Sequence, residues 1–203
     1  MLRRSLAAFM TWGLWVHAPT LARPSEPTAR VTPQALRDYS ALSQAAAHLP
    51  LDERESLVNN HINRHIGYRP DGALDRWQTP AETFATAQGD CEDLAIAKYF
   101  VLRDCGRPCG CERLLYAIHT PLDTPGLHVP HVVLLGGGHP GDPWVYDNLN
   151  LLRMPLSRRS DLQPLFSFDV AHLWRGASGE RLGDAVARLR PWRELLRRWQ
   201  AQR

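Results

Sequence analysis

The stretch QGDCEDLAIAKYF, residues 88–100, decides the fold because it predicts where a central helix begins and what that helix carries. Asp90 followed by Asp93 is a capping pattern, so we expect a helix from there to about Asp104. Cys91 then lies in the first turn. Helix dipoles lower the pKa of a thiol at this position, which is typical of catalytic cysteines, although small buried cysteines are also common and inert. Cys91 is therefore either a nucleophile or a core residue.

Helical patterns precede this stretch and strand-like runs follow it. Thr32 with Pro33 starts one helix and Asp52 with Glu55 starts a second, each carrying an apolar stripe. After a cysteine-rich turn, the runs RLLYAIH, HVVLLGG and PWVYDNLN have the length and composition of strands. This order predicts an α+β domain in which N-terminal helices and the central helix pack on a small antiparallel sheet.

The N-terminal residues 1–22 have the features of a secretory signal peptide. Arg3 and Arg4 precede the apolar run LAAFMTWGLWV, and small residues end at Ala22. Because the run is short for a membrane span, we expect it to be removed on export, with an uncleaved anchor as the alternative. The Pro-rich segment 23–33 is expected to be a linker, and the protein to work outside the cytoplasm.

Charge gives little support for a nucleic-acid partner. The 203-residue chain has 24 Lys and Arg against 21 Asp and Glu, and its arginines are spread rather than clustered on one face. GASGERLGD is expected to be a second linker between a domain, residues 34–176, and a basic amphipathic helix in residues 177–203. Such a helix packs on its own domain, touches an anionic membrane or binds a partner, and these alternatives stay open.

Three of the four cysteines lie close together in CGRPCGC. In an oxidising compartment we expect one disulfide to close this turn, from Cys105 to either Cys109 or Cys111. A soft-metal site is the alternative, but the spacing C-x3-C-x-C lacks an obvious fourth ligand nearby. The pairing is left open at this point.

A nucleophilic cysteine needs a base and a polar group that orients the base. His128 and His131 precede the aliphatic run VVLL, and Asp147 ends the next expected strand. In antiparallel neighbours the start of one strand faces the end of the other, so His131 and Asp147 can meet. The pattern predicts a triad of Cys91, His131 and Asp147. His128 is the alternative base, and capping a turn is the alternative role for Asp147.

Four segments resemble the bacterial transglutaminase-like cysteine peptidases of the LapG type: DRWQTPAETFATAQGDCEDLAIAKYFVLRDCG, HVVLL, VYDNLN and SRRSDLQPLFSFDVAHLW. The likeness runs from about Val58 to Trp174. Its motifs are W-x-T-P-x-E, G-D-C-E-D, a His before an aliphatic strand, and D-N-L. The resemblance implies a papain/transglutaminase-like fold, with Cys91 as nucleophile, His131 as base and Asp147 as the orienting carboxylate.

The resemblance also implies a metal. LapG-type enzymes are calcium-dependent, and their ligands include the acids that flank the cysteine, here Asp90 and Glu92. Asp71 is expected as a further ligand and Asp75 as a weaker one, because oxygen ligands suit Ca²⁺. The alternative is that these acids only cap the helix and complement its dipole.

A biological setting follows from the same resemblance. LapG-type enzymes are periplasmic proteases that cut the N-terminal region of a large surface adhesin, at a small-residue site such as Ala-Ala, and so release it from the cell. An inner-membrane receptor that senses cyclic di-GMP restrains them. Contact with the membrane is then expected only through partners.

Two other functions stay open. The same thioester chemistry gives transglutamination with an amine acceptor, and deamidation when water acts on a Gln side chain. A calcium- or partner-binding relative that keeps the triad without turnover is the third possibility. The extra cysteines, the DRW sequence before the motif and the additional histidine in HVPH depart from the family pattern and put shared substrate specificity in doubt.

Overall fold

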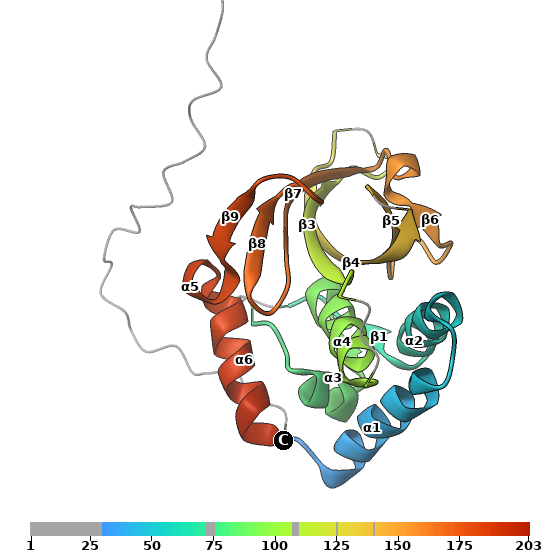
Figure 1. The fold of residues 1–203 in the computed structure, drawn as a ribbon, viewed down its shortest axis with the longest axis vertical. Coiled ribbons are helices and arrows are strands. Elements are labelled where there is room, and N and C mark those ends of the chain that lie inside the picture. Colours follow the sequence, from blue (N-terminus) through green and yellow to red (C-terminus); the bar gives the residue numbers. More distant parts are fainter. Residues whose placement is uncertain (1–29, 72–75, 107–109, 125, 140) are drawn as a thin grey trace, which may run out of the picture.

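Helices pack against an antiparallel sheet, so the α+β architecture predicted from the sequence is confirmed. The computed structural model describes residues 30–71, 76–106, 110–124, 126–139 and 141–203. Figure 1 shows the helical side beneath the central strands. It consists of α1 (Pro33–Ala47), α2 (Leu51–His65), α3 (Pro80–Thr86) and α4 (Cys91–Asp104).

The main sheet has seven strands in the order β6-β5-β4-β3-β7-β8-β9, and neighbours are antiparallel. They are β3 (Arg113–His119), β4 (Val129–His139), β5 (Asp142–Tyr146), β6 (Met154–Pro155), β7 (Leu162–Phe168), β8 (His172–Arg175) and β9 (Arg181–Asp184). A separate parallel pair joins β1 (Gly67–Tyr68) to β2 (Gln88–Gly89). The sequence predicted β3 to β5. It missed β7, which contains Pro164, and β6, β8 and β9, which are too short for a detectable alternation.

Helix α4 lies at the centre of the domain. The Asp90 side chain accepts a hydrogen bond from the Asp93 N–H, and the Asp93 side chain accepts one from the Asp90 N–H. The predicted capping box is therefore confirmed. One side of α4 contacts β4, and α1, α2 and α3 contact its other sides. Contacts on all sides explain why every residue from Leu94 to Leu102 is buried.

The capping pattern predicted at Asp52 is wrong. Helix α2 has Pro50 at its N-cap, and no side chain caps it. Glu55 crosses to the sheet instead, where its carboxylate accepts the Gly137 N–H and the Tyr146 hydroxyl, each at 2.7 Å. Glu55 is 1% exposed, and burial raises the pKa of its carboxyl group. The residue therefore ties α2 to β4 and β5.

Adding a methyl group beside Glu55 should destabilise the domain. A Cβ at Gly136 would overlap Glu55 Oε1 and lie 2.9 Å from Tyr146 Cε2. We expect Gly136→Ala to lower the free energy of unfolding by about 1–3 kcal/mol, measured by urea denaturation. Gly67→Ala is the control, because a Cβ there would meet no atom closer than 3.7 Å. Equal effects of the two substitutions would contradict this explanation.

The basic C-terminal segment packs on its own domain. GASGERLGD was predicted as a linker, but its end forms β9 and pairs with β8, so that prediction is wrong. Helices α5 (Ala185–Arg188) and α6 (Arg190–Gln202) follow. Trp192, Leu195 and Trp199 of α6 are buried in the same apolar cluster as α4. The apolar side of the tail is thus covered by the domain itself.

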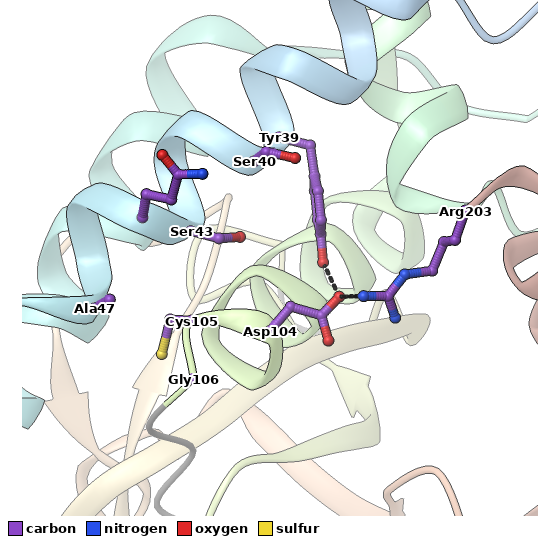
Figure 2. A pocket seen from close by; sticks show the side chains of 9 residues that line it. Tyr39, Ser40, Ser43, Ala47, Asp104, Cys105, Gly106 and Arg203 are labelled. Carbon is purple, nitrogen blue, oxygen red and sulfur yellow. Dashed lines mark hydrogen bonds and ion pairs between the residues drawn. The ribbon is translucent and has the colours of Figure 1, made fainter.

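Polar contacts fix the end of the chain. Asp104 of α4 accepts the Tyr39 hydroxyl at 2.7 Å and pairs with Arg203 at 3.0 Å, beside a cavity of about 280 Å³ (Figure 2). Thr79 Oγ1 donates to Gln202 Oε1 at 2.6 Å. The tail therefore braces the W-x-T-P-x-E loop. No helix in the described ranges is long and apolar enough to cross a membrane.

Cys105 and Cys111 differ in their bonding state. Cys105 is buried and free, and its thiol donates to the Leu102 carbonyl at 2.9 Å, so the predicted disulfide from Cys105 is wrong. Cys105 is the C-cap residue of α4 and belongs to the buried apolar cluster. Cys111 is disulfide-bonded, and Cys109 lies outside the described residues. The predicted signal peptide, residues 1–22, also lies outside them.

Candidate active site

Cys91 is the first residue of α4 and is 8% exposed. Its Sγ donates a hydrogen bond to Glu92 Oε2 at 2.8 Å and accepts one from the backbone N–H of Val132 on β4. Burial raises the pKa of the Cys91 thiol, and the charge and hydrogen bond of Glu92 raise it further, whereas the Val132 N–H lowers it. The resting thiol is therefore protonated and needs a base to become a nucleophile.

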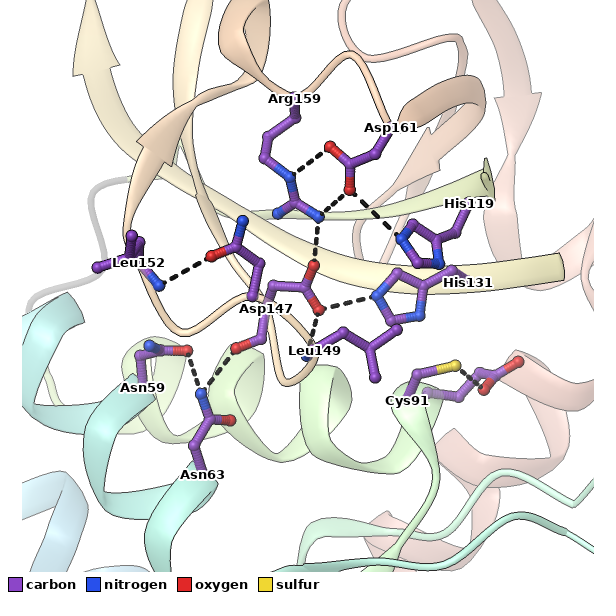
Figure 3. Close-up of polar contacts among 12 residues, drawn as sticks. Asn59, Asn63, Cys91, His119, His131, Asp147, Leu149, Leu152, Arg159 and Asp161 are labelled. Atoms are coloured by element: carbon purple, nitrogen blue, oxygen red, sulfur yellow. Dashed lines mark hydrogen bonds and ion pairs between the residues drawn. The ribbon is translucent and has the colours of Figure 1, made fainter. Parts of the chain in front are cut away.

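The pairing of β4 with β5 brings His131 to Asp147. Leu134 lies opposite Tyr146, so the residue after β5 faces the beginning of β4. His131 Nε2 lies 2.8 Å from Asp147 Oδ1, and both side chains are buried. Figure 3 shows the His131 ring between Asp147 and Cys91. Because Nε2 faces the carboxylate, Nδ1 is the nitrogen left to take a proton from the thiol.

Each oxygen of Asp147 accepts at least one hydrogen bond. Its Oδ1 also accepts the Leu149 N–H at 3.0 Å, its Oδ2 accepts Arg159 Nη2 at 2.7 Å, and its carbonyl accepts Asn63 Nδ2 at 2.7 Å. Burial raises the pKa of Asp147, but hydrogen bonding and charge from His131, and the charge of Arg159, outweigh burial and hold the pKa below its ordinary value. Asp147 is thus a fixed anion that faces His131 and also caps its turn.

His128 does not share this arrangement. Its side chain is exposed, and its Nδ1 lies 2.9 Å from Thr120 Oγ1. Of the two histidines considered as the base, the structure brings His131 to Asp147 and leaves His128 at the surface. The geometry therefore favours His131.

Three carboxylates gather beside the nucleophile. Oxygens of Asp71, Asp90 and Asp93 lie within 4.8 Å of one another. Burial, followed by the charges of Asp93 and Glu92, raises the pKa of Asp90 to about 9. Burial raises the pKa of Asp93 to about 7, and the charge of Asp71 adds to this effect. The cluster therefore concentrates acidic groups that repel one another when ionised.

No family model and no curated protein matches the chain. Among solved structures, EGTA-treated LapG of Legionella pneumophila is 30% identical, the match covers 82% of this chain and 88% of that chain, and the TM-score is 0.71. The chain belongs to the LapG family. A calcium-bound structure of Legionella pneumophila LapG is 28% identical, with 86% and 92% of the two chains covered and a TM-score of 0.69.

The acidic cluster of this LapG-family chain fits a hard cation. Its donors are carboxylate oxygens, which Ca²⁺ prefers, and the pKa values of Asp90 and Asp93 are raised, as expected of buried acids that lie close to one another. Backbone N–H groups of Arg76 and Gln78 orient Asp71 and Asp93, each at 2.7 Å. Hydrogen bonds within the chain therefore hold these two carboxylates in place.

The predicted ligand set is only partly brought together. Asp71 and Asp90 lie in the cluster, but Glu92 does not, because its carboxylate accepts the Cys91 thiol instead. Asp93, which the sequence marked as a capping residue, takes the third place. Asp75, the weaker candidate, lies outside the described residues.

Sequence reasoning missed the residues behind Asp147. Asn63 lies 84 positions earlier on α2, and Arg159 follows a short 3-10 helix, η1 (Leu156–Arg158). Arg159 occurs in SRRSD, within a segment that resembles the family, but arginines are frequent in this chain. No spacing rule distinguishes a buried arginine from an exposed one, so the sequence held no usable signal.

Proposed function

We propose that this protein is a calcium-dependent cysteine endopeptidase that uses Cys91, His131 and Asp147. The observation that carries the proposal is the 2.8 Å contact between His131 and Asp147, beside a cysteine at a helix N-terminus. Membership in the LapG family supports the same reaction class. Cleavage of Ala-Ala-containing adhesin segments by the purified protein, measured with calcium and with EGTA, tests this function.

The first half of the reaction forms an acyl-enzyme. The Cys91 thiol exchanges its hydrogen bond to Glu92 for one to His131 Nδ1, which takes the proton. Asp147 stabilises the imidazolium and fixes its orientation. The thiolate attacks the peptide carbonyl carbon, the C–N bond breaks, and His131 passes its proton to the leaving amine.

Water completes the cycle. His131 takes a proton from water, the hydroxide attacks the thioester, and the carboxylic acid leaves as Cys91 regains its proton. Backbone N–H groups of Cys91 and Glu92 lie in the first turn of α4, where helix geometry supplies no internal acceptor. These N–H groups are our candidates for stabilising the oxyanion.

For the metal, we propose that Asp71, Asp90 and Asp93 hold Ca²⁺. A bound ion would offset the repulsion among these carboxylates next to the nucleophile. Every chemical step above is carried by the side chains and backbone of the chain itself.

Calcium should therefore stabilise the purified protein. At a free concentration about 100 times the Kd, calcium is expected to add about 2.7 kcal/mol to the free energy of unfolding, seen as a higher Tm than in EGTA. Asp71→Asn should reduce this increase, because it removes one charged ligand. The exposed Asp123 is the control, and Asp123→Asn should keep the full increase. An absent shift, or an undiminished one in Asp71→Asn, would exclude the assigned site.

For the substrate, we propose the N-terminal region of a large surface adhesin, cut at a small-residue site such as Ala-Ala. We further propose a periplasmic location and restraint by an inner-membrane cyclic di-GMP receptor. These proposals are supported by family membership and by the features of residues 1–22. Mass spectrometry of adhesin segments after incubation with the protein would identify the bond that is cut.

A further inference from the structure

A line of paired charges extends from Asp147 away from the nucleophile. Arg159 is 2% exposed, and its Nη2 lies 2.7 Å from both Asp147 Oδ2 and Asp161 Oδ2. Its Nε lies 2.9 Å from Asp161 Oδ1. Figure 3 shows the guanidinium between the two carboxylates. His119 Nε2, 3.4 Å from Asp161 Oδ2, ends the line.

These contacts fix the rotation of the Asp147 carboxylate. Oδ1 faces His131 and Oδ2 faces Arg159, so a rotation that exchanged the two oxygens would break both contacts. Two contacts with Asp161 fix the plane of the guanidinium in turn, which a lysine ammonium could not reproduce. The orienting residue of the triad is therefore held by a separate segment of the chain.

Burial of Arg159 has a cost that a structural role alone explains poorly. Removing a guanidinium from water is unfavourable, and well-packed apolar residues often stabilise such a position as well or better. Among the described residues, no group accepts a hydrogen bond from Arg159 Nη1.

Other cations near Asp147 do not replace Arg159. Lys98 of α4 is 1% exposed, and burial lowers its pKa to about 7, so a large fraction is neutral near physiological pH. His131 of β4 is the group that must gain and lose a proton during turnover. Arg159 therefore supplies the permanent positive charge against Asp147.

We propose that Arg159, clamped by Asp161, is a positioning residue that keeps Asp147 and His131 aligned toward Cys91. The inference rests on the proposed function in one respect, since it assumes that these three residues act together. It assigns no contact between Arg159 and the substrate.

Substitutions of graded severity test this inference. We expect Arg159→Gln to lower kcat about 100-fold with KM changed less than about threefold, because a misplaced triad slows chemistry more than binding. Arg159→Lys keeps the positive charge but loses the planar guanidinium. Its kcat should lie between that of Arg159→Gln and that of the unsubstituted protein. Asp161→Asn should lower kcat about tenfold. Arg158 is the matched control, an exposed neighbour, and Arg158→Gln should leave kcat unchanged.

A second readout separates this inference from the choice of substrate. Alkylation of Cys91 by iodoacetamide, followed by peptide mass spectrometry, reports thiol reactivity without any peptide. The variants should slow alkylation in the same order as they lower kcat. If no adhesin segment is cut but this order holds, the proposed substrate fails and the positioning role stands.

Unchanged rates in the substituted proteins would contradict the positioning role. A folded Arg159→Gln with unchanged kcat and alkylation rate would overturn the inference, and so would a lower Tm without any change in those rates. If Arg159→Gln fails to fold, Arg159→Lys and Asp161→Asn carry the test. Unchanged rates in both of these variants would overturn it.

Discussion

Replacing Cys91 by alanine should reduce turnover on the order of 10⁴-fold or more, while the fold is retained. The nucleophile has no substitute at this position, because the other free cysteine among the described residues, Cys105, lies at the opposite end of α4. Truncating one partly buried sulfur should cost about 1 kcal/mol of stability. Peptide cleavage, circular dichroism and Tm measure these effects.

Cys105→Ala is the matched control for this substitution. Cys105 is also buried and at the end of the same helix, but its thiol contacts the Leu102 carbonyl and not the triad. Cleavage should persist in Cys105→Ala. Turnover that survived in a folded Cys91→Ala protein would end the assignment of the nucleophile.

The second large effect is expected from Asp147→Asn, which should lower kcat about 10⁴-fold, because an amide no longer stabilises the imidazolium or fixes its tautomer. Asparagine is nearly the same size, so packing should change little. The neutral side chain does leave Arg159 with one anionic partner fewer, which should also lower the Tm. Asp142→Asn is the control, an acid bonded to Ser157 and not to the triad.

Acid titration gives Asp147→Asn an independent readout. The pKa of Asp147 is depressed in the folded protein, so its contribution to stability is present above the ordinary carboxyl pKa and is lost as pH falls toward the folded value. Between about pH 5 and pH 2, the unsubstituted protein should therefore lose more stability than Asp147→Asn. Equal losses in urea denaturation would contradict an ionised Asp147, as would wild-type turnover in the variant.

Local signals in the sequence predicted the centre of the fold. Asp90 and Asp93 marked the start of α4, since a capping box is a contact within four residues. The antiparallel order of two apolar strands was enough to bring His131 to Asp147. Both predictions depend on neighbours in sequence or on strand direction, which pattern analysis can detect.

Contacts between distant segments were not predictable in this way. Glu55 matched a cap pattern with Asp52, yet its carboxylate accepts hydrogen bonds from the Gly137 N–H of β4 and the Tyr146 hydroxyl of β5, which lie 82 and 91 positions away. Cys105 matched a disulfide pattern, yet it ends α4 on the core side. Arg159 meets Asp147 through a loop whose course only the folded chain defines.

The triad alone does not select the acceptor of the acyl group. Amine transfer to a Gln side chain uses the same thioester, and incubation with a labelled amine and a Gln-rich protein would detect it. Family membership is our reason for placing hydrolysis of a peptide bond first. Incorporation of the amine without peptide cleavage would favour amine transfer over peptide hydrolysis.

Calcium-dependent peptide cleavage is tested most directly by an assay of the purified protein on a panel of Ala-Ala-containing adhesin segments, with calcium and with EGTA. We expect cutting at one bond in calcium and loss of this cutting in EGTA, measured by mass spectrometry of the products. Cutting that survives in EGTA would mean that cleavage does not need calcium. Asp71, Asp90 and Asp93 would then serve only in helix capping and in hydrogen bonds to the loop. No cutting under either condition would contradict the proposal that this triad cleaves an adhesin.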